Sequence, residues 1–150
     1  MMTVSRRELA YRAIERLLAA SAYFQKTGRN TEFLLEACAN LPIAILQDGG
    51  ELAQNVSAGL QHCEADVTID VGVACSERDQ VPAELSRARA EAFNALARWV
   101  DLPEAGTLLA NVTYVGCSAP ELAAKGEARG VMTLIYTMTY VQAELDALAA

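Results

Sequence analysis

The sequence has few of the residues from which catalytic and metal sites are usually built. It contains one histidine, and its four cysteines lie far apart without a CxxC pair. A Ser-His-Asp or Cys-His arrangement would have to use His62. His62 beside Cys63 makes a poor zinc site, since two adjacent ligands and a single histidine are too few. We therefore predict no catalytic residue, no cofactor and no metal, and expect the cysteines to be small buried apolar residues in a protein that is not an enzyme.

Long hydrophobic runs and an excess of basic residues are also missing. No window approaches the roughly 18 consecutive apolar residues of a membrane span, and the start, MMTVSRRELA, has no signal-peptide hydrophobic region. We therefore expect the protein to stay in the compartment where it is made, without a membrane partner. The chain carries 19 acidic and 12 basic side chains, a net charge of −7. This balance argues against nucleic acid as the main partner, but it is compatible with lining a passage through which DNA slips without sticking.

The rest of the composition is that of an ordinary globular domain, with 53% hydrophobic and 21% charged residues in a chain of 150. The spacing of apolar residues predicts two amphipathic helices. The first begins at Ser5, which forms an S-x-x-E capping box with Glu8, and runs to about Phe24. The second covers residues 81–100, with Pro82 in its first turn. Their buried stripes are expected at Leu9, Ala10, Ala13, Ile14, Leu17 and Leu18, and at Leu85, Ala88, Ala92, Leu96 and Trp99.

Strands are predicted at residues 43–47, 66–75, 107–115 and 126–141. The last of these alternates with unusual regularity, so that its two sides differ. Apolar residues expected to pack under the helices are Met132, Leu134, Tyr136, Met138 and Tyr140. The other side, expected to be only half-covered, carries Thr133, Ile135, Thr137 and Thr139. Residues 66–75 place Asp66, Thr68 and Asp70 on a polar face, where a solvated strand explains the two aspartates better than an acid–base pair.

These elements together predict an α+β fold in a single domain covering residues 1–150. The expected architecture is a two-layer sandwich, in which a four-stranded, mainly antiparallel or mixed sheet carries the two amphipathic helices on one face. Gly28 is expected to turn the chain, and residues 31–40 are either a short helix or an irregular packed segment. Ser118 and Glu121 match a capping box for a short helical turn that ends at Gly126. The segment from about residue 142 is expected to be flexible.

Residues 48–65 show no sustained periodicity and are predicted as a long loop between two arms of a hairpin. Hairpin loops normally have two to five residues, so a longer one is usually functional. The segment combines glycines, which make the backbone costly to order, with apolar side chains that a solvated loop does not need. We expect it to become ordered against a partner, or alternatively to fold back over the chain's own sheet. The partner-contact residues on this hypothesis are Asp48, Gly49, Gly50, Glu51, Leu52, Val56 and Leu60.

Several strings in this order of elements resemble one protein family. An amphipathic helix leads to GRN at residues 28–30 and then to LPIAILQDGGE, a proline-led strand running into an acidic, glycine-bearing turn. After the long segment come a strand, a proline-started helix ending in ALARW, and the final RGVMTLIYTMTYV. From about residue 5 to residue 141, the chain resembles the tail terminator proteins of long-tailed bacteriophages, called minor tail protein U in lambda-like phages. The resemblance lies in the order in which these features follow one another along the chain.

This resemblance implies a structural role in the virion, at the head-proximal end of the tail, after assembly in the host cytoplasm. Proteins of this family form a six-fold ring on the completed tail tube, end tube polymerisation and present the docking surface for the head connector. The implied partners are further copies of the chain, the tail tube protein and the head–tail connector, while DNA only passes through. The family has no catalytic residues and no cofactor. On this basis residues 48–65 would contact the tube, with Asp48 and Glu51 meeting basic groups of the tube subunit or the next protomer.

The same resemblance suggests roles for the two faces of the sheet. Thr133, Ile135, Thr137 and Thr139 would form a subunit interface, and Asp66, Thr68 and Asp70 would line the lumen or a polar sheet face. Two alternatives stay open. One is a different neck component, a tail-completion or head–tail adaptor protein of similar size. The other is a cytosolic α+β module or enzyme that binds a small ligand, with residues 48–65 as a lid.

Overall fold

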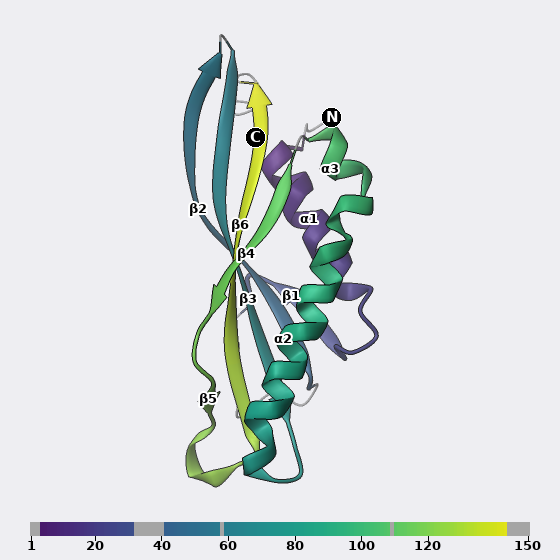
Figure 1. Cartoon of the computed structure of the whole chain (residues 1–150), viewed down its shortest axis with the longest axis vertical. Helices are drawn as coiled ribbons and strands as arrows, with labels where there is room; N and C mark the ends of the chain where they lie inside the picture. Colours follow the sequence, from purple (N-terminus) through teal and green to yellow (C-terminus); the bar gives the residue numbers. More distant parts are fainter. Residues whose placement is uncertain (1–3, 32–40, 58, 109, 144–150) are drawn as a thin grey trace.

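The protein is an α+β fold in which helices cover one face of a mixed sheet (Figure 1). The computed structural model describes residues 4–31, 41–57, 59–108 and 110–143. Within them the helices and strands are α1 (Arg6–Ala19), β1 (Lys26–Arg29), β2 (Ile43–Ser57), β3 (Leu60–Ala74), α2 (Val81–Ala97), α3 (Pro103–Thr107), β4 (Asn111–Cys117), β5 (Glu121–Leu122) and β6 (Arg129–Ala143). The predicted class is confirmed. The sheet has six strands rather than four, and a third, short helix accompanies the two predicted ones.

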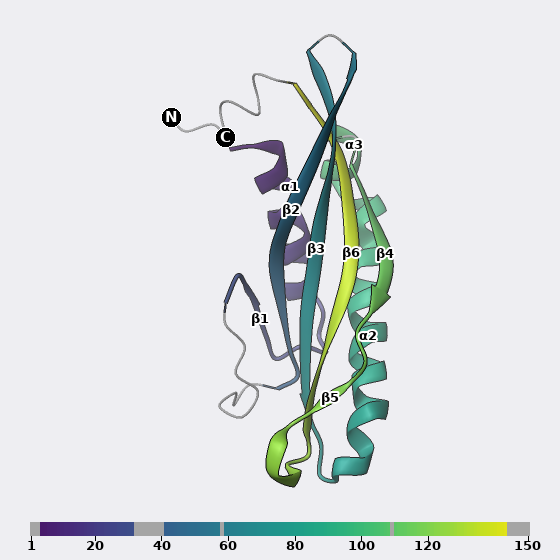
Figure 2. The same cartoon turned by 90° about the vertical axis from the view of Figure 1, so that its left-hand side faces the viewer.

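Three long antiparallel strands form the middle of the sheet. The strand order is β1-β2-β3-β6-β4, and β5 pairs with the beginning of β6. Strand β1 runs parallel to β2, and every other pair is antiparallel. Strands β2, β3 and β6 each have 15 residues. The β2–β3 hairpin consequently projects past the helices at one end of the molecule, whereas β5 lies at the other end (Figures 1 and 2).

The prediction of a loop at residues 48–65 is wrong, because residues 48–57 belong to β2 and residues 60–65 to β3. We call residues 51–57 and 59–65 the hairpin arm. Its strands pair from Glu51 opposite Ala65 to Ser57 opposite Leu60, and Gly59 has a positive φ of 77° at the turn. The β2 side of the arm is exposed throughout residues 51–56, so no buried face imposes an alternating pattern on this part of the sequence. The lack of periodicity therefore reflects solvent exposure.

Gly49 and Gly50 mark a β-bulge, where the register of β2 against β3 shifts between Asp48 and Glu51. A bulge leaves residues unpaired and bends the strand. A side chain at Gly49 has no room, since its Cβ would lie 2.5 Å from the carbonyl oxygen of Asp66. Gly50 has open space around it. The glycine pair thus marks an irregularity inside one long strand.

The hydrophobic core lies between the helices and the inward face of the sheet. The predicted stripe of the second helix is buried at Leu85, Ala88, Ala92, Leu96 and Trp99, and the predicted core side of the last strand is buried at Met132, Leu134, Tyr136, Met138 and Tyr140. In α1, five of the six predicted residues are buried, while Leu9 is 37% exposed and Tyr11 is buried. Ser5 caps α1 as predicted, because its hydroxyl accepts a hydrogen bond from the Glu8 N–H.

Several predicted boundaries differ from the structure. The first helix ends at Ala19, and Phe24 packs into the core after the chain has turned toward the sheet. The expected turn at Gly28 lies within β1, whose pairing with β2 is non-local and leaves no periodic signal in four residues. The positive φ, 52°, belongs instead to Asn30.

The second half of the chain also shows differences. The third predicted strand is shifted and forms β4 at residues 111–117, after helix α3. The expected helix after the Ser118 capping box does not form, since Glu121 and Leu122 pair with β6 and only a 3₁₀ turn at Ala124–Gly126 follows. Residues 32–40 and 144–150, which include the ambiguous segment and most of the segment expected to be flexible, lie outside the described residues.

Among the described residues, no helix lies on the opposite face of the sheet (Figure 2). We call it the bare sheet face and define it by Asp66, Thr68 and Asp70 of β3 and Thr133, Ile135, Thr137 and Thr139 of β6. The three threonines of β6 are half-buried, and Ile135 is 37% exposed. The predicted difference between the two sides of the last strand is therefore confirmed.

A charge on each side of β6 should have unequal effects. Tyr136→Asp places a carboxylate in the core without a partner, and we expect it to lower the free energy of unfolding by roughly 3–5 kcal/mol or to prevent folding. Thr137→Asp adds a charge to the bare sheet face opposite Asp66, and the like charge should cost less than about 1 kcal/mol. Urea denaturation followed by circular dichroism measures both. Equal losses would contradict the two-sided description of the sheet.

Candidate functional site

An arginine at the base of the hairpin arm joins three elements. Arg29 of β1 donates from Nε and Nη2 to the two carboxylate oxygens of Asp48 in β2, at 2.9 and 2.7 Å. Its Nη1 donates to both carboxylate oxygens of Glu8 in α1, at 2.7 and 2.6 Å. The Arg29 side chain is 18% exposed. Charged, bidentate hydrogen bonds are among the strongest polar contacts in proteins, so this residue fixes the position of α1 against the sheet.

Tyr11 of α1 fills the space beneath the bulge. Its ring lies between two guanidinium groups, with the Cζ atoms of Arg7 and Arg29 each 5.1 Å from the ring centroid. Its hydroxyl donates to the carbonyl oxygen of Asp66 at 2.8 Å and accepts from the Gly49 N–H at 3.2 Å. One side chain therefore bonds both strands where the register shifts. Burial raises the pKa of the Tyr11 hydroxyl, which keeps it protonated as a donor.

Arg7 completes what we call the root cluster, formed by Arg7, Glu8, Tyr11, Arg29 and Asp48. It donates to the carbonyl oxygen of Gly49 at 2.6 Å, and its Nη1 lies 3.6 Å from a carboxylate oxygen of Glu51. Burial alone would raise the pKa of the Asp48 carboxyl, but the hydrogen bond and charge of Arg29 outweigh it, so the pKa is lowered. The group is therefore ionised at neutral pH and holds its partners.

The residues predicted to contact a tail tube divide into two groups. Asp48 and Glu51, expected to meet basic groups of another protein, face Arg29 and Arg7 of their own chain, and Gly49 is packed against Asp66. These three positions stabilise the arm. The other four, Gly50, Leu52, Val56 and Leu60, are exposed along it, with Leu52 at 77%. This second group and the exposed Glu51 are accessible to another molecule.

The bare sheet face brings together two sets of residues that the sequence assigned to different roles. Thr133 lies opposite Asp70, Ile135 opposite Thr68, and Thr137 opposite Asp66. Thr133 Oγ1 donates to Asp70 Oδ1 at 2.7 Å. The carboxylate of Glu64 continues the same side of β3 toward the arm. The result is one polar, acidic surface, so the subunit-interface and lumen assignments concern the same place.

His62 and Cys63 point to opposite faces of β3, His62 exposed and Cys63 fully buried. Across the described residues, no three histidine, cysteine or acidic side chains gather closely enough to hold a metal ion. The expectation of buried cysteines holds for Cys63 and fails for Cys117, which is exposed; Cys75 is half-buried, and Cys38 lies outside the described residues. Burial raises the pKa of both the Cys63 and Cys75 thiols, which disfavours a nucleophilic thiolate.

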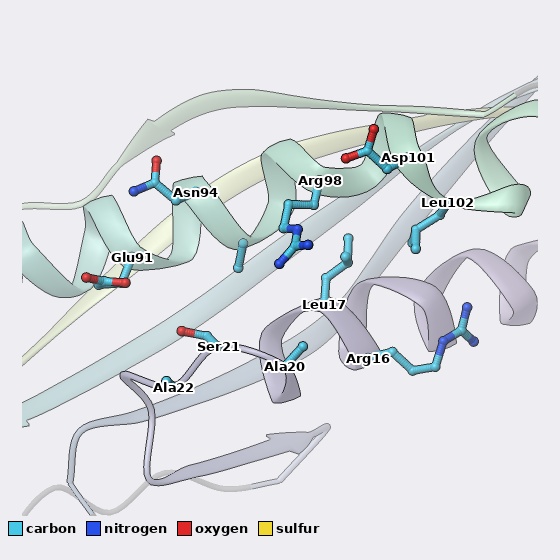
Figure 3. A pocket seen from close by; sticks show the side chains of 11 residues that line it. Arg16, Leu17, Ala20, Ser21, Ala22, Glu91, Asn94, Arg98, Asp101 and Leu102 are labelled. Atoms are coloured by element: carbon cyan, nitrogen blue, oxygen red, sulfur yellow. The ribbon is translucent and has the colours of Figure 1, made fainter.

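A groove of about 630 Å³ lies between the end of α1 and the second half of α2 (Figure 3). Leu17, Ser21, Asn94 and Arg98 are among its lining residues, and Arg16 at its rim pairs with Glu104 of α3. As far as the described residues go, the lining contains no histidine or cysteine, and its charged residues are Arg16, Glu91, Arg98 and Asp101. The groove can therefore hold polar and charged groups. Separately, no helix in the described ranges is both long and apolar enough to cross a membrane.

Sequence analysis did not identify Arg7, Tyr11 and Arg29, which hold the base of the arm. They come from α1 and β1, and only the folded sheet brings them together. One sequence signal was available: the alternation of Val67, Ile69 and Val71 extends backward through Ala65 and Cys63. Following it would have predicted a longer β3 and therefore a projecting hairpin.

The root cluster should be sensitive to the shape of its central cation. Arg29→Lys keeps the charge but has three donors on one nitrogen and cannot make the paired hydrogen bonds to both carboxylates, so we expect it to lower the free energy of unfolding by about 1–3 kcal/mol. Arg12→Lys is the matched control, because Arg12 is 54% exposed and lies 3.8 Å from Glu8; its change should stay below about 0.5 kcal/mol. Urea midpoints measure both, and similar values for the two variants would refute the role of Arg29.

Asp48 should make this stability depend on pH. Because the folded-state pKa of its carboxyl is below the ordinary value of 3.8, its contribution is present above pH 3.8 and is lost as the pH falls through the folded-state value. Asp48→Asn should therefore be less stable than the unchanged chain at pH 7, by about 1–3 kcal/mol, with a smaller difference at pH 3. Urea unfolding at both pH values measures this, with the exposed Asp101→Asn as control. A difference that is unchanged at pH 3 would contradict the pairing.

Comparison with known proteins adds no relative. No protein-family model matches this chain, and no curated protein sequence matches it. A functional hypothesis must therefore come from the geometry of the root cluster, the arm and the bare sheet face.

Proposed function

We propose that the chain is a structural virion protein that forms a ring on the end of a phage tail tube, stops tube growth and offers a docking surface to the head connector. The observation that carries the proposal is the hairpin arm. It projects past the helices and exposes Leu52, Val56 and Leu60, which a chain acting alone has no reason to display. The root cluster anchors the arm, so it presents these side chains in a fixed direction.

The two ends of the molecule differ in the way that a terminating cap requires. The arm lies at one end, and β5 with the 3₁₀ turn at Ala124–Gly126 lies at the other (Figure 1). A cap must bind the last layer of tube subunits on one side and offer a different surface on the other, so that no further subunit can be added. We assign the arm to the tube and the β5 end to the connector.

The bare sheet face supplies a surface for the lumen. Glu64, Asp66 and Asp70 lie on the same side of β3 among the threonines of β6. Carboxylates repel phosphate groups, so DNA would pass such a wall without binding to it. The net charge of −7 has the same effect over the whole chain.

The alternatives differ in what they predict. Another neck component, such as a tail-completion or head–tail adaptor protein, would share the ring but bind elsewhere on the particle. The small-ligand hypothesis used residues 48–65 as a lid, and those residues are paired strands. The groove between α1 and α2 remains as a place for a small ligand with polar or charged groups.

The test is tube capping with the full chain and its cognate tube subunit. We expect the purified chain to stop tube growth and to appear in negative stain as a ring at one tube end. In a shortened variant, residues 55–61 are replaced by Asn-Gly, which keeps the Gln54–His62 pair next to a tight turn. This variant should remain folded but leave tubes to grow without control.

The control is the full-length chain with Val100→Asp, an exposed apolar position in the helix layer, which should cap normally. Tubes of uncontrolled length in the presence of the unchanged chain would overturn the proposal. Rings bound only to connectors would favour the other neck component, and normal capping by the shortened variant would remove the arm from the tube contact.

A further inference from the structure

The sheet has two open edges on opposite sides. Strand β4 has β6 on one side and no strand on the other within the described residues. Strand β1 pairs only with Ile43–Leu46 of β2, so the β2 side of the arm, residues 51–57, also lacks a neighbour on its outer side. Strand β4 has seven residues, the same length as this stretch. Each protomer thus carries one edge of each kind.

The main-chain groups that point out of these edges follow from the register. Ser118 donates to the carbonyl oxygen of Thr133 at 2.8 Å, and inward and outward groups alternate along an antiparallel strand. Along β6, therefore, Thr137 and Thr139 also bond to β4, and their partners Thr113 and Asn111 point inward. Because β4 has a register shift between Tyr114 and Gly116, the N–H and C=O of Val112 and Tyr114 point away from the sheet. The even-numbered residues of β6 bond to β3, and by the same alternation the even-numbered residues of β3 bond to β2. Leu52 and Gln54, opposite Glu64 and His62, therefore point inward. The N–H and C=O of Glu51, Ala53 and Asn55 point outward on the arm.

Neither edge is protected against pairing. Proteins usually protect an exposed edge strand with lysine, proline or other charges, but β4 has no charged residue and no proline. On the arm, the charge of Glu51 is engaged by Arg7. Both edges also expose apolar side chains: Val115 on β4 is 61% exposed, and Phe93 stands against Tyr114 beside it with ring centroids 5.8 Å apart. Leu52 is the corresponding residue on the arm.

We propose that β4 of one copy of this chain pairs antiparallel with the β2 side of the arm of the next copy. Tyr114 lies opposite Ala53 and Val112 opposite Asn55, because these residues have outward main-chain groups. Thr113 then lies opposite Gln54, and Val115 lies beside Leu52, which covers the most exposed apolar side chain on each edge. The inference rests on the proposed ring and names the contact that builds it.

The offset of this contact favours closure. Within one protomer, Asn111 is level with Leu52 through Thr139 and Glu64. In the proposed contact, Asn111 of one copy lies opposite Val56 of the next copy. The level at Leu52 in one copy therefore continues at Val56 in the next, an offset of four residues. Each copy adds four strands, β2, β3, β6 and β4, to the sheet. The shear of a closed sheet is the total offset, in residues, after one turn around it. With four residues and four strands for each copy, the shear equals the number of strands for any number of copies. The eight-stranded barrel with shear 8 has this ratio and a strand tilt of about 36°, within the usual range for closed barrels.

The direction of curvature follows from the helix layer. A closed sheet has a larger circumference on its outer side than on its inner side. The helix layer takes up more space than the bare sheet face, so the helices lie outside the ring and the bare sheet face lies inside. This places Thr133, Thr137 and Thr139 in the lumen beside Asp66 and Asp70. The subunit contact then consists of strand edges instead of the threonine face expected from the sequence.

A disulfide between copies tests the register. Gln54→Cys and Thr113→Cys are introduced together into a chain whose Cys38 and Cys117 are replaced by serine. The two positions form a non-hydrogen-bonded pair, whose Cα atoms are about 4.5 Å apart in an antiparallel sheet, within the range that a disulfide spans. Inside one chain, β3 and β6 separate them. Mild oxidation should produce multimers on a denaturing gel, whereas the control pair Gln54→Cys with Thr137→Cys, which reports contact through the sheet face, should not.

A proline variant tests the hydrogen bonds of the same edge. Ala53→Pro removes an outward N–H without removing a bond to β3, so the protomer should fold normally but fail to form rings by light scattering. Ala53→Val keeps the N–H and should assemble.

The outcomes of the two experiments separate the edge contact from the cap proposal. Rings that form without the 54–113 disulfide, or rings formed by Ala53→Pro, would overturn the edge contact and leave the cap proposal standing. Cross-linked chains that stay open would support the contact and contradict the cap, and a chain that stays monomeric even on tubes would overturn both.

Discussion

The direction of the hairpin arm depends on one set of contacts, those of Arg29 with Asp48 and Glu8. Strand β2 has a bulge at Gly49 and Gly50, opposite Asp66 of β3, and a bulge is the point at which a long ribbon can bend. Tyr11 bonds the main chain of both strands there, and Arg7 holds Gly49 and Glu51. All of these groups reach the bulge from α1 or β1, so side chains of the body hold the base of the arm, together with Cys63 and Ala65 of the arm, which lie in the hydrophobic core.

The two halves of the sheet are stabilised differently. Below the bulge, apolar side chains of β3 and β6 pack against α1 and α2, and burial supplies most of the stability. Along the arm, residues 51–56 of β2 are exposed and pair with β3, whereas Cys63 and Ala65 of β3 are buried and pair with β6. In the proposed ring, the exposed arm, the open β4 edge and the acidic bare sheet face are the surfaces that meet other molecules.

The sequence predicted the parts of the fold in which one face is buried. The stripe of α2 and the alternation of β6 were correct because burial on one side imposes a period of 3.6 or two. Residues 48–65 were predicted wrongly because exposure removes that constraint, and because Gly49 and Gly50 indicate a bulge as readily as a loop. Strand β1 and the root cluster could not be predicted, since each depends on residues that only tertiary pairing brings together. The exposed Leu52, Val56 and Leu60 were identified correctly as unusual, although in the wrong kind of structure.

The position of β6 also determines how the chain can fold as it is synthesised. This strand follows all other described elements in the sequence, yet it lies between β3 and β4 in the sheet. Until it leaves the ribosome, the β2–β3 hairpin and β4 have no strand to join them, and β3 presents an open edge of 15 residues. Pairing β3 with β6 brings together residues far apart in the sequence, which is slow in comparison with forming a hairpin. A nascent chain therefore carries an unpaired edge until its last strand arrives, and this interval is when self-association through the wrong strand is most probable.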